Sequence, residues 1–137
     1  MLGLHQILLD ENEIAKAANR PKITELKVSF SRDGFHWDRP YREAFIPATR
    51  VPGSWDRGYV QSVGGICTVV GDQLRFYYIG FKGGDPSSYM HSNGATGMAI
   101  LRRDGFASMS TTGEGSLTTR PVTFTGKYLF VNVDCPS

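Results

Sequence analysis

Apolar and polar side chains alternate along residues 24–31, with the sequence TELKVSFS. Leu26, Val28 and Phe30 fall on one face of an extended chain, and the residues between them are polar or charged. An alternation with a period of two is typical of a β-strand that is buried on one face only. The pattern therefore predicts a half-buried strand over residues 24–31.

Residues 59–84 give the clearest pattern in the chain and predict three strands. The second and third of them are joined through Gly71-Asp72, a pair that suits a tight hairpin turn. The third contains the run FYYIGF, whose bulky aromatic side chains favour a position inside a sheet. Residues 82–97 are rich in Gly, Ser and Asn, which predicts an exposed loop.

Shorter strand-like runs occur at both ends of the chain. GLHQI near the N-terminus and MAILRRDGF at residues 98–106 each predict one strand, and residues 120–134 predict two short strands around Thr125-Gly126. Only residues 11–20 are compatible with a helix, which Pro21 would end; a polar loop with one helical turn is the alternative. The class predicted from these patterns is all-β.

The tetrapeptide RDGF occurs twice, at residues 32–35 and 103–106, each time after a strand-like run. In both copies we expect the Asp to accept hydrogen bonds from turn amides and the Gly to supply a positive φ. The following Phe is expected to pack back against the sheet. Four to five strand-like runs separate the copies, about one four-stranded unit, which favours β-propeller blades. A β-sandwich with two similar hairpins is the alternative.

Composition agrees with a β-protein and excludes several partners. The chain has 16 glycines and 12% aromatic residues, and its net charge of +2 is too weak and dispersed to indicate a nucleic-acid or membrane surface. No apolar run approaches the roughly 20 residues of a membrane helix, and the N-terminus does not resemble a secretory signal, so a cytoplasmic location is expected if the chain is complete. Two cysteines and three scattered histidines form no ligand cluster, so we expect no metal and no cofactor.

Four stretches together resemble a known group of proteins: SFSRDGFHWDRP, WDRGYVQSVGGICTVVGDQLRFYYIGF, GATGMAILRRDGFASM and LTTRPVTFTGKYLFVNVD. They are similar to the C-terminal part of the glycoside-hydrolase-like five-bladed propellers, which include levanases, invertases, arabinanases and β-xylosidases, and above all to uncharacterised bacterial members. The resemblance implies antiparallel propeller blades, about two of them, in residues 1–110. It also implies that residues 111–137 are a linker and terminal strands that begin a C-terminal β-sandwich.

The resemblance also implies a function and an oligomeric state. Catalytic carboxylates of the superfamily lie mostly on the first three blades, so a complete acid pair is expected to be absent here. The uncovered edges of a partial propeller imply a homo-oligomer or a fragment. We therefore expect a chain that contributes to a carbohydrate-binding site for an oligo- or polysaccharide. A non-enzymatic β-rich assembly domain that oligomerises through its sheet edges is the alternative, and a stand-alone carbohydrate-binding domain is a third.

Candidate sugar contacts gather in the stretch WDRGYVQS, before a strand that would be the innermost one of a blade. Asp56, Tyr59 and Gln61 are expected to face the central pocket, since Tyr59 and Gln61 alternate onto one face. Trp55 could stack on a sugar ring or belong to the core. His5 is a further candidate contact, with a surface or internally bonded histidine as the alternative.

Overall fold

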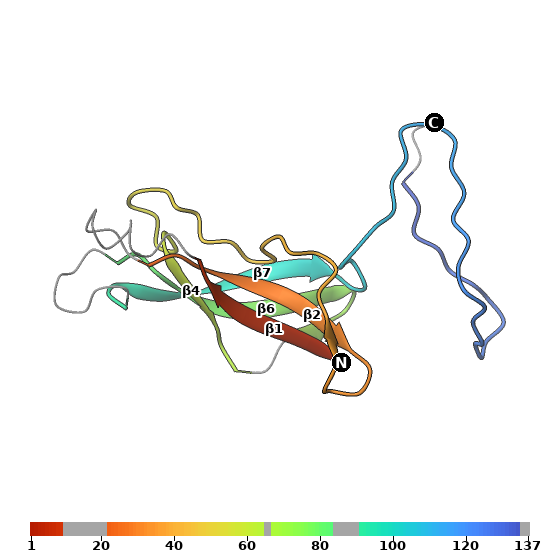
Figure 1. The fold of residues 1–137 in the computed structure, drawn as a ribbon, viewed down its shortest axis with the longest axis horizontal. Coiled ribbons are helices and arrows are strands. Elements are labelled where there is room, and N and C mark those ends of the chain that lie inside the picture. Colours follow the sequence, from red (N-terminus) through yellow and green to blue (C-terminus); the bar gives the residue numbers. More distant parts are fainter. Residues whose placement is uncertain (10–21, 65–66, 84–90, 135–137) are drawn as a thin grey trace. The chain divides into compact units, whose positions relative to one another are not determined.

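A computed structural model describes residues 1–9, 22–64, 67–83 and 91–134 of the chain. The chain divides into two compact units, Met1–Ala107 and Ser108–Ser137 (Figure 1). Every regular element of the described residues is a β-strand, so the all-β class is confirmed. The helix considered for residues 11–20 lies outside the described residues.

Sheet A is built from the first three strands, β1 (Leu2–Leu8), β2 (Thr24–Ser31) and β3 (Trp37–Asp38). They are antiparallel in the order β1-β2-β3, and Leu4 pairs with Val28 in the first ladder. Leu26 and Val28 are buried as their alternation predicted. The strands predicted over residues 24–31 and near the N-terminus are therefore confirmed.

Sheet B is built from the next four strands, β4 (Tyr59–Ser62), β5 (Thr68–Val70), β6 (Gln73–Phe81) and β7 (Gly94–Arg102). β4 and β5 pair with opposite ends of β6, while β7 pairs along its whole length. The two-residue hairpin predicted between β5 and β6 is confirmed, with Gly71 at a φ of +60°. All of these ladders are antiparallel.

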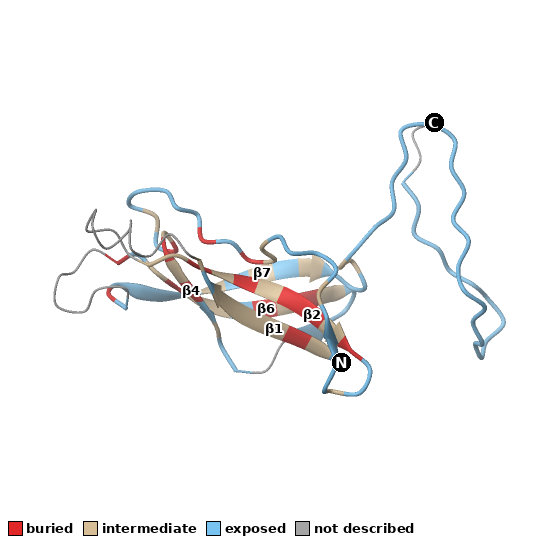
Figure 2. Cartoon of the chain, viewed as in Figure 1, coloured by how far each residue is buried: buried red, intermediate tan, exposed pale blue. Residues whose placement is uncertain are grey.

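The hydrophobic core lies between the two sheets. Its buried members come from both sheets and from the connection between β3 and β4: Leu26, Ile46, Ala48, Val60, Leu74 and Phe76. Figure 2 marks the buried positions along β2 and β6. Burying a large apolar side chain contributes about 1.5–3 kcal/mol, so this cluster is the main stabilising element of the first unit.

Thr24 fixes β4 against the start of β2. Its amide donates to the carbonyl of Gly58 at 2.9 Å. Its Oγ1 donates to the carbonyl of Val60 at 2.9 Å and accepts from the Val60 amide at 2.8 Å. The Thr24 hydroxyl therefore bonds to both backbone groups of Val60, as a neighbouring strand would. These bonds fix the position of Tyr59, the first residue of β4.

The first RDGF corner forms as predicted in its backbone. Asp33 accepts hydrogen bonds from the amides of Phe35 at 2.9 Å and His36 at 2.8 Å, and Gly34 has a φ of +83°. Phe35 is a correction, because it is 87% exposed and does not pack against the sheet. Trp37 closes this corner instead, donating from its indole nitrogen to the Gly34 carbonyl at 3.0 Å.

The second RDGF corner differs from the first. Here Asp104 takes the positive φ, +62°, while Gly105 does not, and the Gly105 amide donates to the Arg102 carbonyl at 2.9 Å. The expectation of two equivalent corners is therefore wrong. Only Phe106 behaves as predicted, packing edge-on against Phe30 at 5.7 Å between ring centroids.

Two further predictions are wrong about where strands lie. β7 begins at Gly94, although residues 94–97 were expected to belong to a loop, because full pairing with β6 overrides their weak strand preference. The described residues of 108–134 contain no strand, although two were expected after residue 120. A strand needs a partner for its backbone groups, and these residues have no ladder partner in the described structure. The expected β-sandwich therefore has no strand in this part of the chain.

Candidate functional site

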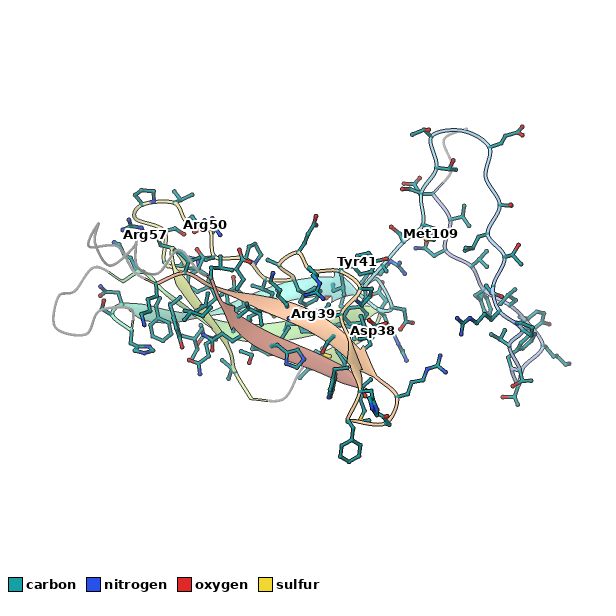
Figure 3. All side chains as sticks on the ribbon, viewed as in Figure 1. Asp38, Arg39, Tyr41, Arg50, Arg57 and Met109 are labelled. Carbon is teal, nitrogen blue, oxygen red and sulfur yellow. The ribbon has the colours of Figure 1, made fainter. Side chains whose placement is uncertain are left out.

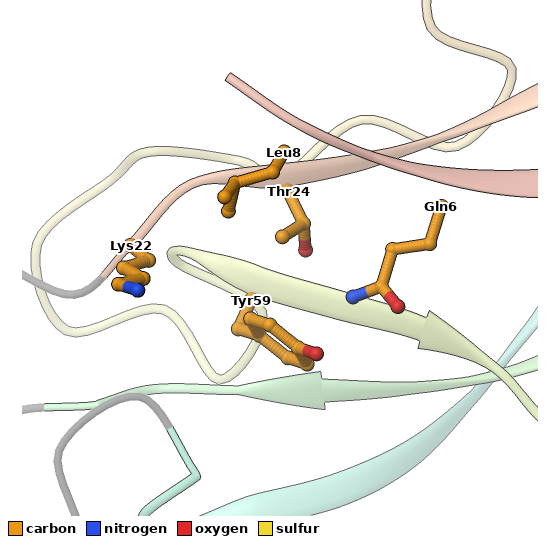
Figure 4. Close-up of a pocket in the computed structure, with 5 residues that line it drawn as sticks. All are labelled: Gln6, Leu8, Lys22, Thr24 and Tyr59. Carbon is orange, nitrogen blue, oxygen red and sulfur yellow. The ribbon is translucent and has the colours of Figure 1, made fainter. Parts of the chain in front are cut away.

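A pocket of about 250 Å³ lies where the ends of sheet A and the start of β4 meet (Figure 4). Its lining combines two residues of β1, one of β2, one of β4 and one that precedes β2: Gln6, Leu8, Thr24, Tyr59 and Lys22. The pocket therefore depends on the hydrogen bonds of Thr24 to Gly58 and Val60, which join the two sheets. It is the place where an aromatic ring, an amide and an ammonium group come together.

Two other aromatic rings contact the Tyr59 ring. Phe81 and His91 contact it edge-on, at 5.6 Å and 4.9 Å between ring centroids. Edge-to-face contacts of this kind restrict the orientation of a ring. Tyr59 is thus a preorganised surface, and a flat ligand face could stack on it without further ordering of the side chain.

Gln6 interrupts an apolar stripe of β1 that otherwise consists of Leu2, Leu4 and Leu8. It pairs across the ladder with fully buried Leu26, so its side chain lies on the core face of sheet A. Its Nε2 atom is buried and has no hydrogen-bond partner among the described residues. An unmade hydrogen bond of this kind costs about 1–3 kcal/mol. A polar residue in an apolar stripe was the sequence signal that could have identified it.

Lys22 supplies the one formal charge among the five lining residues. Among the described residues no acidic side chain lines the pocket, because the remaining members are an amide, an aliphatic side chain, a hydroxyl and a phenol. Glu25 is near in sequence, but it pairs with Ile7 across the ladder and so belongs to the other face of sheet A. There it lies 3.4 Å from Arg50 and 4.0 Å from Lys27.

Of the five residues expected to contact a sugar, Tyr59 lines this pocket. Gln61 shares its face of β4, as the pairs Tyr59–Phe81 and Gln61–Ile79 show, but it is exposed and outside the lining. The expected alternation of the two residues onto one face is thus confirmed. Neither Lys22 nor Gln6 was among the sequence candidates.

Asp56 is placed in a hairpin and does not line the pocket. It is 6% exposed, and its carboxylate accepts from Thr49 Oγ1 at 3.0 Å and from Ser54 Oγ at 2.5 Å. Backbone hydrogen bonds from Thr49 to Asp56 and from Arg50 to Arg57 close the hairpin; Figure 3 labels both arginines. Burial, together with the negative charge of Asp56, raises the pKa of nearby Tyr78.

Trp55 packs on sheet B, as the core alternative predicted, and its role as a sugar contact stays a prediction. A Cβ atom at Gly80 would lie 2.6 Å from Trp55 Cζ3, and one at Gly97 would lie 2.9 Å from Cζ2. The ring also lies beside Tyr78, with centroids 5.5 Å apart and planes tilted by 33°. Since the side chain remains 37% exposed, part of the indole packs on the sheet and part reaches solvent.

His5 lies on the opposite face of sheet A from Gln6, because neighbouring residues of a strand alternate. Its Nε2 atom shares a hydrogen bond with Ser29 Oγ, and its ring meets Trp37 edge-on at 5.7 Å. The structure therefore places His5, Trp55 and Asp56 outside the lining around Tyr59. The five predicted contacts do not form one cluster.

The described residues form neither a metal site nor a membrane-spanning helix. The described residues contain no group of three or more His, Cys, Asp or Glu side chains that could hold a metal ion. Within the same ranges, no helix is long and apolar enough to cross a membrane. What the pocket offers chemically is hydrogen bonding, positive charge and an aromatic surface.

No protein-family model, no curated protein and no solved structure matches this chain. The resemblance to glycoside-hydrolase-like propellers therefore stays a prediction. Function has to be argued from the pocket itself.

Proposed function

We propose that this chain is a carbohydrate-recognition part of a glycoside-hydrolase-like propeller and lacks a complete pair of catalytic acids. The observation that supports it is the pocket around Tyr59, where a fixed aromatic ring adjoins the Gln6 amide. Sugar rings have apolar faces and hydroxyl edges, so an aromatic surface with polar groups at its side suits them. The proposal thus rests on Tyr59 and its neighbours.

The arrangement of strands supports the propeller part of the proposal. Sheet A uses consecutive strands β1–β3, and sheet B uses β4–β7, all in antiparallel ladders. Blades of a propeller are small antiparallel sheets, each formed by one continuous stretch of chain. In sheet B, β4 pairs with β6 and not with β5, and the two RDGF corners differ, so the support comes only from two successive antiparallel sheets.

The pocket suits recognition better than hydrolysis. Glycosidases need two carboxyl groups about 5–9.5 Å apart at the scissile bond. None of the five lining residues carries a carboxyl group, and the carboxylate of Asp56 is engaged by Thr49 and Ser54. We accordingly assign no catalytic residue to the pocket.

The test is a glycan-binding screen of the intact chain followed by calorimetry on any ligand found. Tyr59→Ala should weaken binding by about tenfold or more, because stacking on an aromatic ring is lost. Tyr41→Ala is the matched control, since Tyr41 is exposed and lies outside the lining. If no glycan binds the folded chain, or if both variants lose binding equally, the proposed function is wrong.

One observation favours a second candidate function, assembly through sheet B. The face of sheet B that carries Tyr77 also carries Val70, Met98 and Ile100, and all four are exposed. Gln73 and Arg75 of β6 share this face, and exposed apolar side chains gathered on one face of a sheet mark interaction surfaces. We infer that a second copy of the chain is the partner.

A further inference from the structure

Figure 4 shows Lys22 and Gln6 on opposite sides of Tyr59, and each of the two side chains carries a nitrogen donor. One is Nε2 of Gln6, which is buried and unpaired among the described residues. The other belongs to Lys22, which forms no ion pair with any other described residue. An ammonium group donates and cannot accept, and the amide nitrogen likewise only donates.

The pocket therefore has donors that need acceptors. A carboxylate only accepts hydrogen bonds, and its bonds to a charged donor are about twice as strong as neutral ones. The five described lining residues carry no negative charge that would repel it. Glu25, the acidic residue next to Thr24, lies on the other face of sheet A and is paired with Arg50 and Lys27.

Size limits what can enter. A volume of about 250 Å³ lies just below the roughly 300–1,000 Å³ of sites that hold drug-sized ligands. One sugar ring on Tyr59, with the rest of an oligosaccharide outside, is the occupant that such a volume suits.

We propose that the pocket recognises an anionic sugar residue, one whose ring stacks on Tyr59 while Lys22 binds its carboxylate and Gln6 donates to a hydroxyl on the other side. This inference rests on the proposed carbohydrate function and names the class of sugar. It assigns a role to Gln6 and Lys22, two polar lining residues that the sequence patterns did not single out.

Calorimetry on the full chain tests the inference with oligomers of galacturonate and of glucuronate, each compared with its methyl ester. The ester keeps the sugar ring and removes the charge. At least one free acid should bind about tenfold or more tightly than its ester, because a hydrogen bond to a charged group is lost in the ester. Lys22→Gln should abolish this preference, because affinity for the acid falls to about the affinity for the ester.

Two variants separate recognition from general effects. Lys82→Gln removes the same charge from an exposed position outside the lining, so the preference for the acid should remain. Gln6→Leu should lower affinity for the acid, while the urea midpoint stays equal or rises. Replacing an unpaired buried donor by an apolar group is neutral or stabilising for folding. A purely structural Gln6 would instead lower the midpoint.

The outcomes separate the anionic class of the sugar from the carbohydrate function itself. If acid and ester bind equally, or if neutral glycans bind and uronates do not, the anionic class is wrong while the carbohydrate function stands. If the folded chain binds none of these sugars, the proposed function fails together with the inference. A preference for the acid that survives Lys22→Gln would also overturn the assignment.

Discussion

Asp33 shows how one carboxylate organises a whole corner. Besides the amides of Phe35 and His36, it receives hydrogen bonds from Ser31 Oγ at 3.2 Å and from the His36 ring at 2.6 Å. These bonds favour the charged form, so they hold the pKa of Asp33 well below its ordinary value of 3.8, and the His36 amide is the largest cause. The corner therefore depends on an ionised side chain at the surface.

Acid should weaken the first corner. Because the folded-state pKa of Asp33 is depressed, its stabilisation is fully present above pH 3.8 and is lost as the pH falls from there toward the folded-state pKa. Asp33→Asn should lower the urea midpoint at pH 7, and its difference from the parent chain should shrink in acid. The pKa of Asp33 itself can be followed by NMR of its carboxyl carbon.

Asp104→Asn is the control because it changes the same residue of the same tetrapeptide. Asn tolerates the positive φ of Asp104, so the urea midpoint should change little at any pH. A normal pKa for Asp33, or an equal effect of both variants, would contradict the role given to the first corner.

The two corners also show what a short motif can predict. RDGF located both turns, but their geometry depends on flanking residues. Ser31 and His36, which bond to Asp33, are replaced by Arg102 and Ala107 in the second copy. The second Asp therefore lacks the neighbours that fix the first, and a four-residue identity could not reveal this difference.

At the scale of elements, Trp55 depends on glycines in two neighbouring strands. Its ring lies over Gly80 of β6 and Gly97 of β7, where any Cβ would meet the indole. Alternation and turn residues predicted most strands, since each signal is local. They could not predict that β7 extends back to Gly94, because the reason lies in its pairing with β6.

Gly97→Ala should displace Trp55. Its Cβ would overlap Cη2 of the indole and lie 2.9 Å from Cζ2 and 3.0 Å from the Tyr78 ring, so the free energy of unfolding should fall by about 1–3 kcal/mol, the usual cost of overpacking. Urea unfolding measures this loss, and Trp fluorescence in a Trp37→Phe background reports the movement of the ring.

Gly113→Ala serves as the matched control, because no atom lies within 4 Å of the position of its Cβ. Its unfolding free energy should change by less than about 0.5 kcal/mol. If Gly97→Ala is equally harmless, Trp55 is not seated on the sheet as described.

At the scale of the whole molecule, the candidate site was the least predictable part. Tyr59 was identified because it begins a strand, but the other lining residues come from two distant places along the chain, residues 6–8 and 22–24. Their meeting depends on Thr24, whose hydroxyl joins β2 to β4 across 36 positions of sequence. A long-range contact made by one ordinary Thr leaves no periodic signal, so the pattern of residues could predict strands without predicting the pocket.

The exposed face of sheet B leads to the last prediction, which concerns assembly. Met98 and Ile100 are 45% and 54% exposed, and Tyr77 lies directly opposite Met98 in the ladder. Apolar side chains on such a face gain free energy when a second copy covers them, and a stable interface buries about 800 Å² on each partner. Sedimentation should therefore give the mass of two chains, and Met98→Lys combined with Ile100→Lys should give the mass of one. Val51→Lys, which charges an equally exposed apolar residue outside the sheets, should leave the dimer intact. If the unaltered chain stays monomeric at high concentration, the assembly function is wrong, whereas the pocket and its sugar would be unaffected because they need no second copy.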